Sequence, residues 1–295
     1  MPRAAIRAKG KTAAGQARAT PLKPSQPTER DARLFVASVE KALLMLGAFD
    51  GERGPLSIAD LASTTGIGRS AAQRFAYTLH ALGYLRRDET TRRYSLAPRL
   101  LSLSRGYLSG DPLLEHAAPV ISGIARESGE AASLSQLDGT DIVVVLRVPS
   151  QHVLALNVMP GARYPAYCSS PGRAMLAALP ERDAAEIIAR SDRQRFTPST
   201  IVSPERLARE IERARRQGYA LANQELYAGS LSVAVAVLDA AGRPAAALNI
   251  FCPSARWSAE RVRARLVPLL RAGAAELSAT MRPGGQAIAA GQARH

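Results

Sequence analysis

The chain has 295 residues, enough for two modest domains, and its 46% hydrophobic and 22% charged residues are ordinary for a soluble globular protein. Its net charge of +14 is unusual and predicts attraction to a polyanion such as DNA. The absence of a long apolar run and of a secretory signal excludes a membrane span and export, and two cysteines exclude a disulfide framework, so we expect a cytoplasmic protein.

Residues 1–32 are predicted to be a disordered basic tail. Their first thirty positions hold seven Lys or Arg and one acid, Glu29, with Ile6 and Leu22 as the large apolar residues. Such a composition cannot bury enough surface to offset the entropy of the chain. We therefore expect either an arm that follows DNA or a solvated tail.

A domain is predicted at residues 33–97, and it begins with a helix over residues 35–49. The expected buried stripe of this helix consists of Val36, Val39, Leu43 and Leu46, with Phe49 at its end. We expect this stripe to pack beneath the two helices that follow.

Residues 57–96 predict two short helices, a tight turn and a basic β-hairpin. Ser57 and Asp60 have the spacing of a capping box, and Gly66 and Gly68 supply the turn. The second helix is expected to bury Ala72, Phe75, Ala76, Leu79 and Leu82 and to expose Arg69, Ser70, Gln73, Arg74 and Tyr77. The hairpin carries Arg92 and Arg93. This order is typical of a winged helix-turn-helix, whose second helix enters the major groove; the alternative is a helical hairpin with an ordinary charged face.

The remaining chain predicts a linker helix at 98–110, an α+β domain at 111–281 and a flexible tail at 282–295. The linker helix is too apolar to be a free connection, and Asp111-Pro112 has the residues favoured at a helix start. Expected strands lie at 131–137, 142–148, 153–157, 219–222, 231–238 and 245–251, and expected helices at 171–179, 181–190, 204–217 and 258–281. Strands interleaved with helices in this way indicate the α+β class.

The loop and helix of residues 161–175 are the first candidate for a ligand site. Ser169-Ser170-Pro171 stands where the helix begins, and free N–H groups at a helix N-terminus can hold a carboxylate. Plain capping by serine is the alternative. Arg147 and Arg173 could also pair with a carboxylate, although surface charges are the commoner outcome. For Glu225, ligand binding and structural capping remain equally open.

Several segments resemble the IclR family of bacterial transcriptional regulators. SVEKAL (38–43), IADLA (58–62), LGYL (82–85) and RRYSLAPRLL (92–101) resemble its DNA-binding half. ASLSQLDGTDIVVVLRVPS (132–150), PAYCSSPGRAMLAALP (165–180), QGYALANQEL (217–226) and AALNIF (246–251) resemble its effector-binding half. The resemblance covers most of residues 35–281 in the correct order.

The resemblance implies a two-domain fold, with a winged helix-turn-helix followed by a GAF-like α+β effector-binding domain, and a linker helix that helps to pair two subunits. It implies effector contacts at Val153, Leu156, Tyr164, Cys168, Ser169, Ser170, Pro171, Gly172, Asn223, Ser232 and Asn249. Asn223 stands where the family often has an acidic residue, and Asn249 where it often has a small hydroxyl residue. These departures leave the polar contacts of the ligand open.

The predicted function is therefore a ligand-responsive, sequence-specific transcriptional regulator without a cofactor. Its expected partners are double-stranded operator DNA, a small aromatic or dicarboxylic acid and a second copy of the chain, as a homodimer or as a tetramer on DNA. Among the branches of the family, the sequences of the motifs most resemble the branch that controls aromatic-acid catabolism. One alternative is an enzyme that uses Cys168 as nucleophile with His152 as base. Another is a non-specific nucleoid-type protein that binds DNA through its basic tail.

Overall fold

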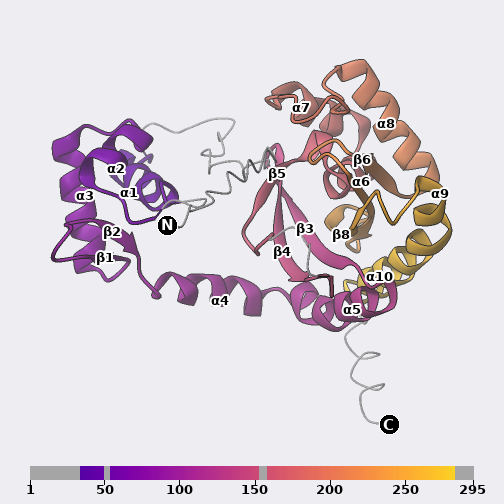
Figure 1. The fold of residues 1–295 in the computed structure, drawn as a ribbon, viewed down its shortest axis with the longest axis horizontal. Coiled ribbons are helices and arrows are strands. Elements are labelled where there is room, and N and C mark those ends of the chain that lie inside the picture. The colour runs from indigo at the N-terminus through magenta and orange to yellow at the C-terminus, as the bar shows by residue number, and fades with distance from the viewer. Residues whose placement is uncertain (1–33, 50–53, 153–157, 283–295) are drawn as a thin grey trace, which may run out of the picture.

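The computed structural model describes residues 34–49, 54–152 and 158–282. These residues form two folded parts, and a single helix connects them (Figure 1). The first part consists of three helices and a small hairpin, and the second is a sheet with helices on both faces. Within the described ranges, no helix is long and apolar enough to cross a bilayer.

The first part is the predicted helix-turn-helix with a hairpin. It comprises α1 (Ala37–Gly47), α2 (Ile58–Thr65), α3 (Arg69–Ala81), β1 (Leu85–Arg87) and β2 (Tyr94–Leu96). The capping box forms as expected, because Asp60 N–H donates to Ser57 Oγ at 3.2 Å and Ser57 N–H donates to the Asp60 carboxylate at 2.9 Å. Gly66 ends α2 with a φ of 70°, a left-handed conformation that favours glycine. The two helices are therefore bounded by their own local signals.

Helix α1 buries a different face from the one that we predicted. Met45, Ala48 and Phe49 enter the core, whereas Val36, Val39 and Leu43 are exposed. Apolar residues occur on more than one side of the helix, beside Ser38, Glu40 and Lys41, so periodicity could not decide which side turns inward. Leu82 is also exposed rather than buried, because α3 ends one residue before it.

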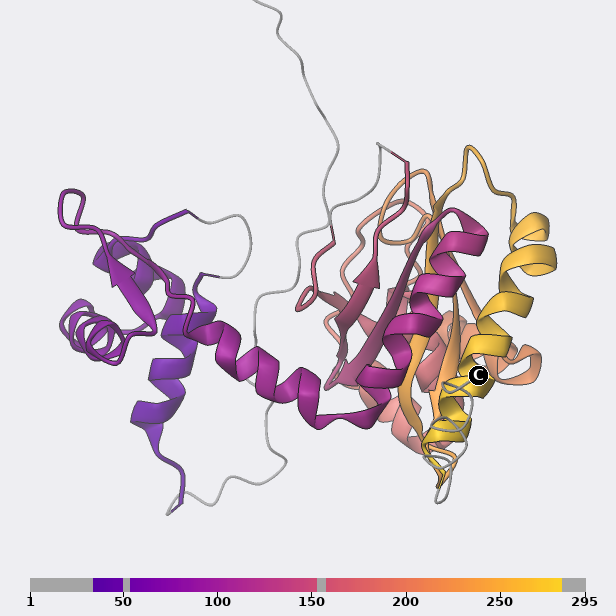
Figure 2. The same cartoon turned by 90° about the horizontal axis from the view of Figure 1, so that it is seen from below.

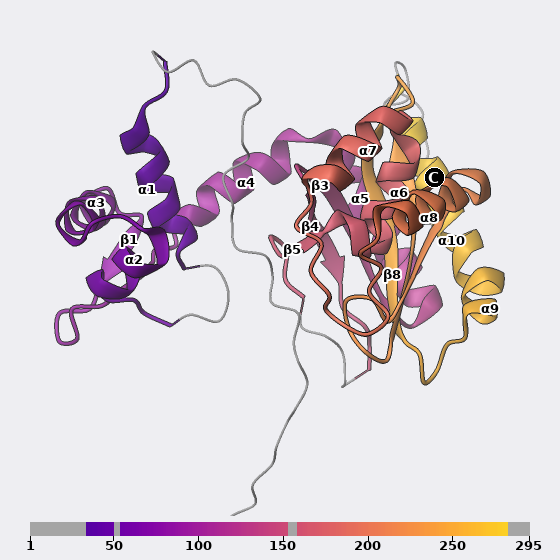
Figure 3. The same ribbon diagram turned by 90° about the horizontal axis from the view of Figure 1, so that it is seen from above.

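Helix α4 (Leu100–Gly110) connects the two parts and has no buried residue. Figures 2 and 3 show α4 as a single helix running between the two parts. At its C-terminal end, Tyr107 Oη donates to Gln136 Oε1, and Gln136 Nε2 donates to the Asp111 carboxylate at 3.3 Å. Asp111 also caps α5 (Pro112–Ser128) by accepting from Leu113 N–H. The end of α4 is thus fixed to the first strand of the sheet.

The strands of the second part form one antiparallel sheet in the order β5-β4-β3-β8-β7-β6. They span β3 (Ala131–Asp138), β4 (Asp141–Val148), β5 (Arg163–Pro165), β6 (Ala220–Asn223), β7 (Ser230–Leu238) and β8 (Pro244–Pro253). Five of them fall where the sequence predicted strands. The strand expected at 153–157 lies outside the described residues, and β5 lies in a segment predicted to be a loop.

Helices cover both faces of this sheet (Figure 2). One face packs against α5 and α10 (Val267–Thr280), and α10 follows the short α9 (Ala259–Arg261) and a π-helical turn over Val262–Leu266. The other face packs against α6 (Ser170–Ala178) and α8 (Pro204–Gln217), and α7 (Glu181–Arg190) packs on these two helices. The 3₁₀ turn at Ala166–Cys168 leads into α6. Helices therefore cover both faces of the sheet, and Ser133 and Ser135 on β3 are buried.

The backbone makes a very close approach at the start of α6. A Cβ atom added to Gly172 would lie 2.3 Å from the carbonyl oxygen of Ala166. Gly172 is therefore required for packing between α6 and the turn before it, and it does not belong to the residues that line the pocket described below.

We predict that Gly172→Ala destabilises the sheet-containing part by at least about 2 kcal/mol, because the added methyl group meets backbone that cannot move aside. The matched control is Gly123→Ala in α5, where an added Cβ has no neighbour within 4 Å. This control should raise stability by about 0.5–1 kcal/mol, as alanine does in a helix interior. Urea unfolding followed by circular dichroism measures both changes, and equal midpoints for the two variants would contradict the packing argument.

Candidate functional sites

The outer face of α3 is the first candidate site. Arg69, Ser70, Gln73, Arg74 and Tyr77 are all exposed, as predicted, and Tyr77 is 70% exposed. A shallow groove on this face is lined by Ser70, Gln73, Arg74, Tyr77 and Thr78. The N-terminus of α3 has no side-chain cap and no acidic residue in its first turn. This end of the helix therefore presents positive potential suited to a phosphate.

The two arginines of the hairpin have different surroundings. Arg92 is exposed and has one weak partner, Glu89, at 3.7 Å. Arg93 instead donates through Nη1 to the Pro55 carbonyl at 2.9 Å and to the Asp60 carboxylate at 3.2 Å. Hydrogen bonds from Ser57 and the charge of Arg93 lower the pKa of Asp60. Arg93, which we predicted to contact DNA, thus fastens the hairpin to the start of α2.

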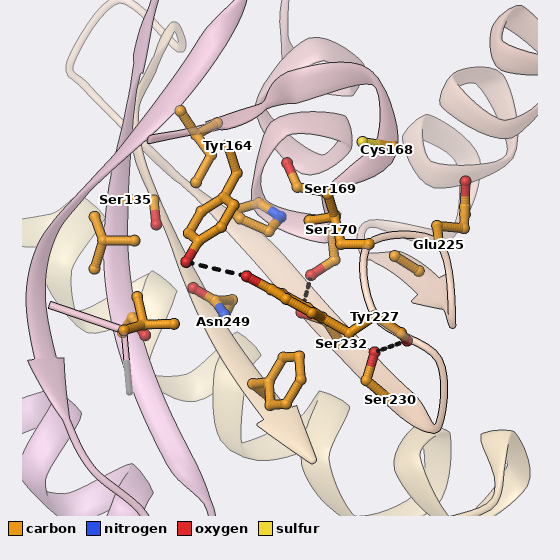
Figure 4. Close-up of a pocket in the computed structure, with 18 of the residues that line it drawn as sticks. Ser135, Tyr164, Cys168, Ser169, Ser170, Glu225, Tyr227, Ser230, Ser232 and Asn249 are labelled. Carbon is orange, nitrogen blue, oxygen red and sulfur yellow. Dashed lines mark hydrogen bonds between the residues drawn. The ribbon is translucent and has the colours of Figure 1, made fainter. Parts of the chain in front are cut away.

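The second candidate site is a pocket between the sheet and the start of α6 (Figure 4). Of the effector contacts predicted from sequence, it contains Tyr164, Cys168, Ser169, Ser170, Pro171, Ser232 and Asn249. Gly172 and Asn223 are not among its lining residues, and Asn223 is exposed at the end of β6. Val153 and Leu156 lie outside the described residues. The pocket also contains residues that the sequence did not indicate: Ser133, Ser135, Ile142, Val144, Tyr227, Ser230 and Phe251.

At the start of α6, serines serve both as cap and as pocket wall. Ser169 Oγ accepts a hydrogen bond from Gly172 N–H at 3.3 Å, which is the capping alternative considered for this segment. Ser170 Oγ faces the pocket and lies 2.6 Å from Ser232 Oγ on β7. Pro171 has no N–H to offer. The helix start therefore presents a hydroxyl pair to a ligand, with fewer free backbone donors than we expected.

The sheet side of the pocket carries a polar row across three strands. Ser133 on β3 lies opposite both Asn249 on β8 and Arg147 on β4. Arg147 Nη1 is 3.5 Å from Ser133 Oγ. Burial lowers the pKa of Arg147, but an arginine remains charged at neutral pH. Arg147, which we expected more often to be a surface charge, is partly buried and brings a cation to the pocket.

Aromatic side chains form another wall of the pocket. The rings of Tyr164 and Tyr227 meet edge to face with centroids 6.4 Å apart, and Tyr227 meets Phe251 in the same way at 6.1 Å. Tyr227 Oη donates to Tyr164 Oη at 3.4 Å. Burial raises the pKa of Tyr227, so its hydroxyl stays protonated. These three rings come from three distant segments, which explains why the sequence did not reveal them as a group.

Behind the start of α6 lies a buried ion pair. Arg173 donates through both Nη atoms to the two oxygens of Glu225 at 2.6 Å each. Arg173 also donates through Nε to the Tyr167 carbonyl at 2.7 Å, and Glu225 accepts from Ile201 N–H at 3.1 Å. Arg173 is 1% exposed, so the expectation of a surface charge was wrong. Glu225 lines the pocket, but its charge is already balanced by Arg173.

Cys168 does not have the surroundings of a nucleophile. The thiol is fully buried, and burial raises its pKa to about 12. Since the thiolate is the reactive form, almost none is present at neutral pH. The candidate base His152 is exposed and does not line the pocket. In the described part of the chain, no cluster of three or more histidine, cysteine or acidic residues could hold a metal ion.

Two domain families match this chain. Residues 38–89 match the IclR helix-turn-helix domain, and residues 105–279 match the C-terminal domain of the bacterial transcriptional regulator IclR. The Pca regulon regulatory protein of Pseudomonas putida is 35% identical over 244 residues, covering 82% of this chain and 83% of that protein. The p-hydroxybenzoate hydroxylase transcriptional activator of Acinetobacter baylyi is 32% identical over 248 residues, covering 82% and 91%.

A solved structure agrees over the whole described fold. The crystal structure of a transcriptional regulator from a Rhodococcus species has a TM-score of 0.73 and 35% identity, covering 84% of this chain and 98% of that chain. The first matched range lies in the helix-turn-helix part and ends before β2, and the second begins within α4 and covers the sheet-containing part. The predicted fold class is thereby confirmed, and the matches give no support to the enzyme or nucleoid alternatives.

Proposed function

The chain belongs to the IclR family of bacterial transcriptional regulators, and we propose that the ligand to which it responds is a small aromatic or dicarboxylic acid bound between the sheet and α6. The single observation that carries this proposal is the charge of the pocket. Among its lining residues, Glu225 is the one acid and pairs with Arg173, and Arg147 is the one basic residue. An anion therefore gains favourable electrostatic interaction on entering, and the raised pKa of Cys168 supports a binding role over a catalytic one.

The relatives support the same class of ligand. One of them is named as a regulator of a Pca regulon and another as an activator of p-hydroxybenzoate hydroxylase, an enzyme whose name contains an aromatic acid. The aromatic wall of Tyr164, Tyr227 and Phe251 suits the flat body of such an acid. We place the carboxylate at Ser169–Pro171, and we expect the protein in the cytoplasm, where its operator DNA lies.

The first test concerns the ligand. Ser170→Glu puts a negative charge beside the expected carboxylate, so affinity for an acid that binds the wild type should fall at least about tenfold. Ser122→Glu on the exposed side of α5 is the matched control and should leave affinity unchanged. Titration calorimetry with benzoate, hydroxybenzoates and adipate measures this. Undiminished affinity in Ser170→Glu, with operator binding intact in both variants, would place the pocket elsewhere.

The second test concerns DNA. We propose that α3 reads bases through Arg69, Ser70, Gln73, Arg74 and Tyr77, and that Arg92 contacts the phosphate backbone. Gln73→Ala should change base preference, whereas Arg92→Ala should weaken all sequences and lower the salt slope by about 1. Arg182→Ala on exposed α7 controls for net charge. Binding to a panel of operator variants at several salt concentrations checks these roles, and identical profiles for Gln73→Ala and Arg92→Ala would refute them.

Arg93 is expected to act indirectly. Because its guanidinium bonds Pro55 and Asp60, Arg93→Ala should lower the unfolding temperature of the helix-turn-helix part as well as its DNA affinity. Arg92→Ala should lower DNA affinity alone. If Arg93→Ala unfolds at the wild-type temperature but binds DNA more weakly, Arg93 contacts DNA directly.

The third test concerns assembly. We propose a homodimer, or a tetramer on DNA, because one helix-turn-helix contacts too few base pairs for tight specific binding. The exposed apolar side chains of α1 and α4 supply a surface for pairing: Val36, Val39, Leu43, Leu101, Leu103, Tyr107 and Leu108. Leu103→Glu should yield monomers with weakened operator binding, whereas Ser102→Glu, about 100° away around α4, should not. Analytical ultracentrifugation at micromolar concentration decides, and a monomeric wild type with full operator affinity would remove the proposal.

A further inference from the structure

Two buried polar atoms in the pocket have no hydrogen-bond partner among the described residues. They are Ser135 Oγ on β3 and Asn249 Oδ1 on β8. Ser135 is 0% exposed and Asn249 is 8% exposed, so bulk solvent does not serve them. Figure 4 shows both side chains on the sheet side of the pocket. Buried polar groups in native proteins are nearly always paired, so two orphans in one pocket point to contacts completed by a bound molecule.

The strand register brings the two atoms to the same face of the sheet. Asn249 pairs with Ser133, and Ser135 pairs with Ala247. Side chains two positions apart on one strand share a face, so Ser135 and Asn249 are diagonal neighbours across the β3–β8 pair. The pairing of β3 with β4 shifts register between Leu134 and Ser135. Such an irregularity is a common way to redirect one side chain at a binding site.

The chemistry of the two groups defines what they can bind. The carbonyl oxygen of Asn249 only accepts hydrogen bonds, whereas the hydroxyl of Ser135 can donate one. Their complement is a group that donates to Asn249 and accepts from Ser135, and a hydroxyl does both. A carboxylate at neutral pH has no proton to donate, so it cannot satisfy Asn249 Oδ1. Water can fill this role while no ligand is bound.

Building on the proposed function, we propose that Ser135 and Asn249 form a hydroxyl-binding subsite and that the effector is a hydroxylated aromatic acid. The carboxylate lies at the start of α6, the ring lies among Tyr164, Tyr227 and Phe251, and the ring hydroxyl reaches the sheet. Ser135 thereby becomes a specificity-determining residue for the ligand. A dicarboxylic acid would instead direct its second carboxylate to Arg147. The pocket charge alone allows both aromatic and dicarboxylic acids, and the contact made by the far end of the ligand distinguishes them.

The test compares ligands that differ in one substituent. Titration calorimetry on the full chain uses benzoate, 4-methylbenzoate, 3-hydroxybenzoate, 4-hydroxybenzoate and adipate. At least one hydroxybenzoate should bind wild type about tenfold or more tighter than benzoate, because a site built for a hydroxyl rejects analogues that lack it. 4-Methylbenzoate should not reproduce the gain. In Ser135→Ala and Asn249→Leu, the preference for hydroxybenzoates over benzoate should fall to within about threefold.

Ser230→Ala is the matched control, because Ser230 also lines the pocket but its hydroxyl already donates to the Tyr227 carbonyl at 2.6 Å. This variant should keep the wild-type preference. Equal binding of benzoate and hydroxybenzoates, or an undiminished preference in Ser135→Ala, overturns the subsite while the proposed function stands. Binding of adipate alone overturns the subsite in favour of a dicarboxylic effector. Binding of none of the five probes overturns both proposals. Thermal unfolding of each variant confirms that it folds.

Discussion

The pocket depends on the buried pair of Arg173 and Glu225. Two charges withdrawn from water are stable only when every remaining donor and acceptor is satisfied. Here the guanidinium holds both carboxylate oxygens and the Tyr167 carbonyl, and the carboxylate also holds Ile201 N–H. The pair thus joins the first turn of α6, the 3₁₀ turn before it, the segment after β6 and the loop before α8. The serines of α6 and Tyr227 are presented to the ligand by one connected unit.

Much of the fold could be predicted because its signals are local. The capping box of Ser57 and Asp60, the left-handed Gly66 and the Asp111-Pro112 helix start each lie within a few residues. The buried face of α1 could not be predicted, since Leu43 and Met45 are apolar residues on different sides of the helix and the core takes up Met45. Periodicity reveals an apolar side of a helix, but it does not reveal whether that side packs within the same chain or against another chain.

The site was predictable to the same extent and for the same reason. Ser169, Ser170 and Pro171 could be predicted because a helix start is a local feature. The alternating serines of β3 could not be assigned to a pocket from sequence, since a polar face on a strand is normally a solvent face. Helix α6 covers that face, and so Ser133 and Ser135 become pocket residues. Arg173 was misjudged because its partner is 52 residues away.

The contact between Gln136 and the end of α4 has a geometric consequence. Ser135 and Gln136 are consecutive residues of β3, so the strand shows one side chain to the pocket and the next to Tyr107 of the connecting helix. With 11 residues, α4 is about 16 Å long. Asp111, directly after α4, also accepts a hydrogen bond from Gln136, and a rotation of α4 by about 10° about this point would move its far end by about 3 Å. That distance is close to the roughly 3.4 Å rise between successive bases of a DNA strand. A rotation of about 10° at the C-terminal end of α4 thus corresponds to a shift of about one base pair at its N-terminal end.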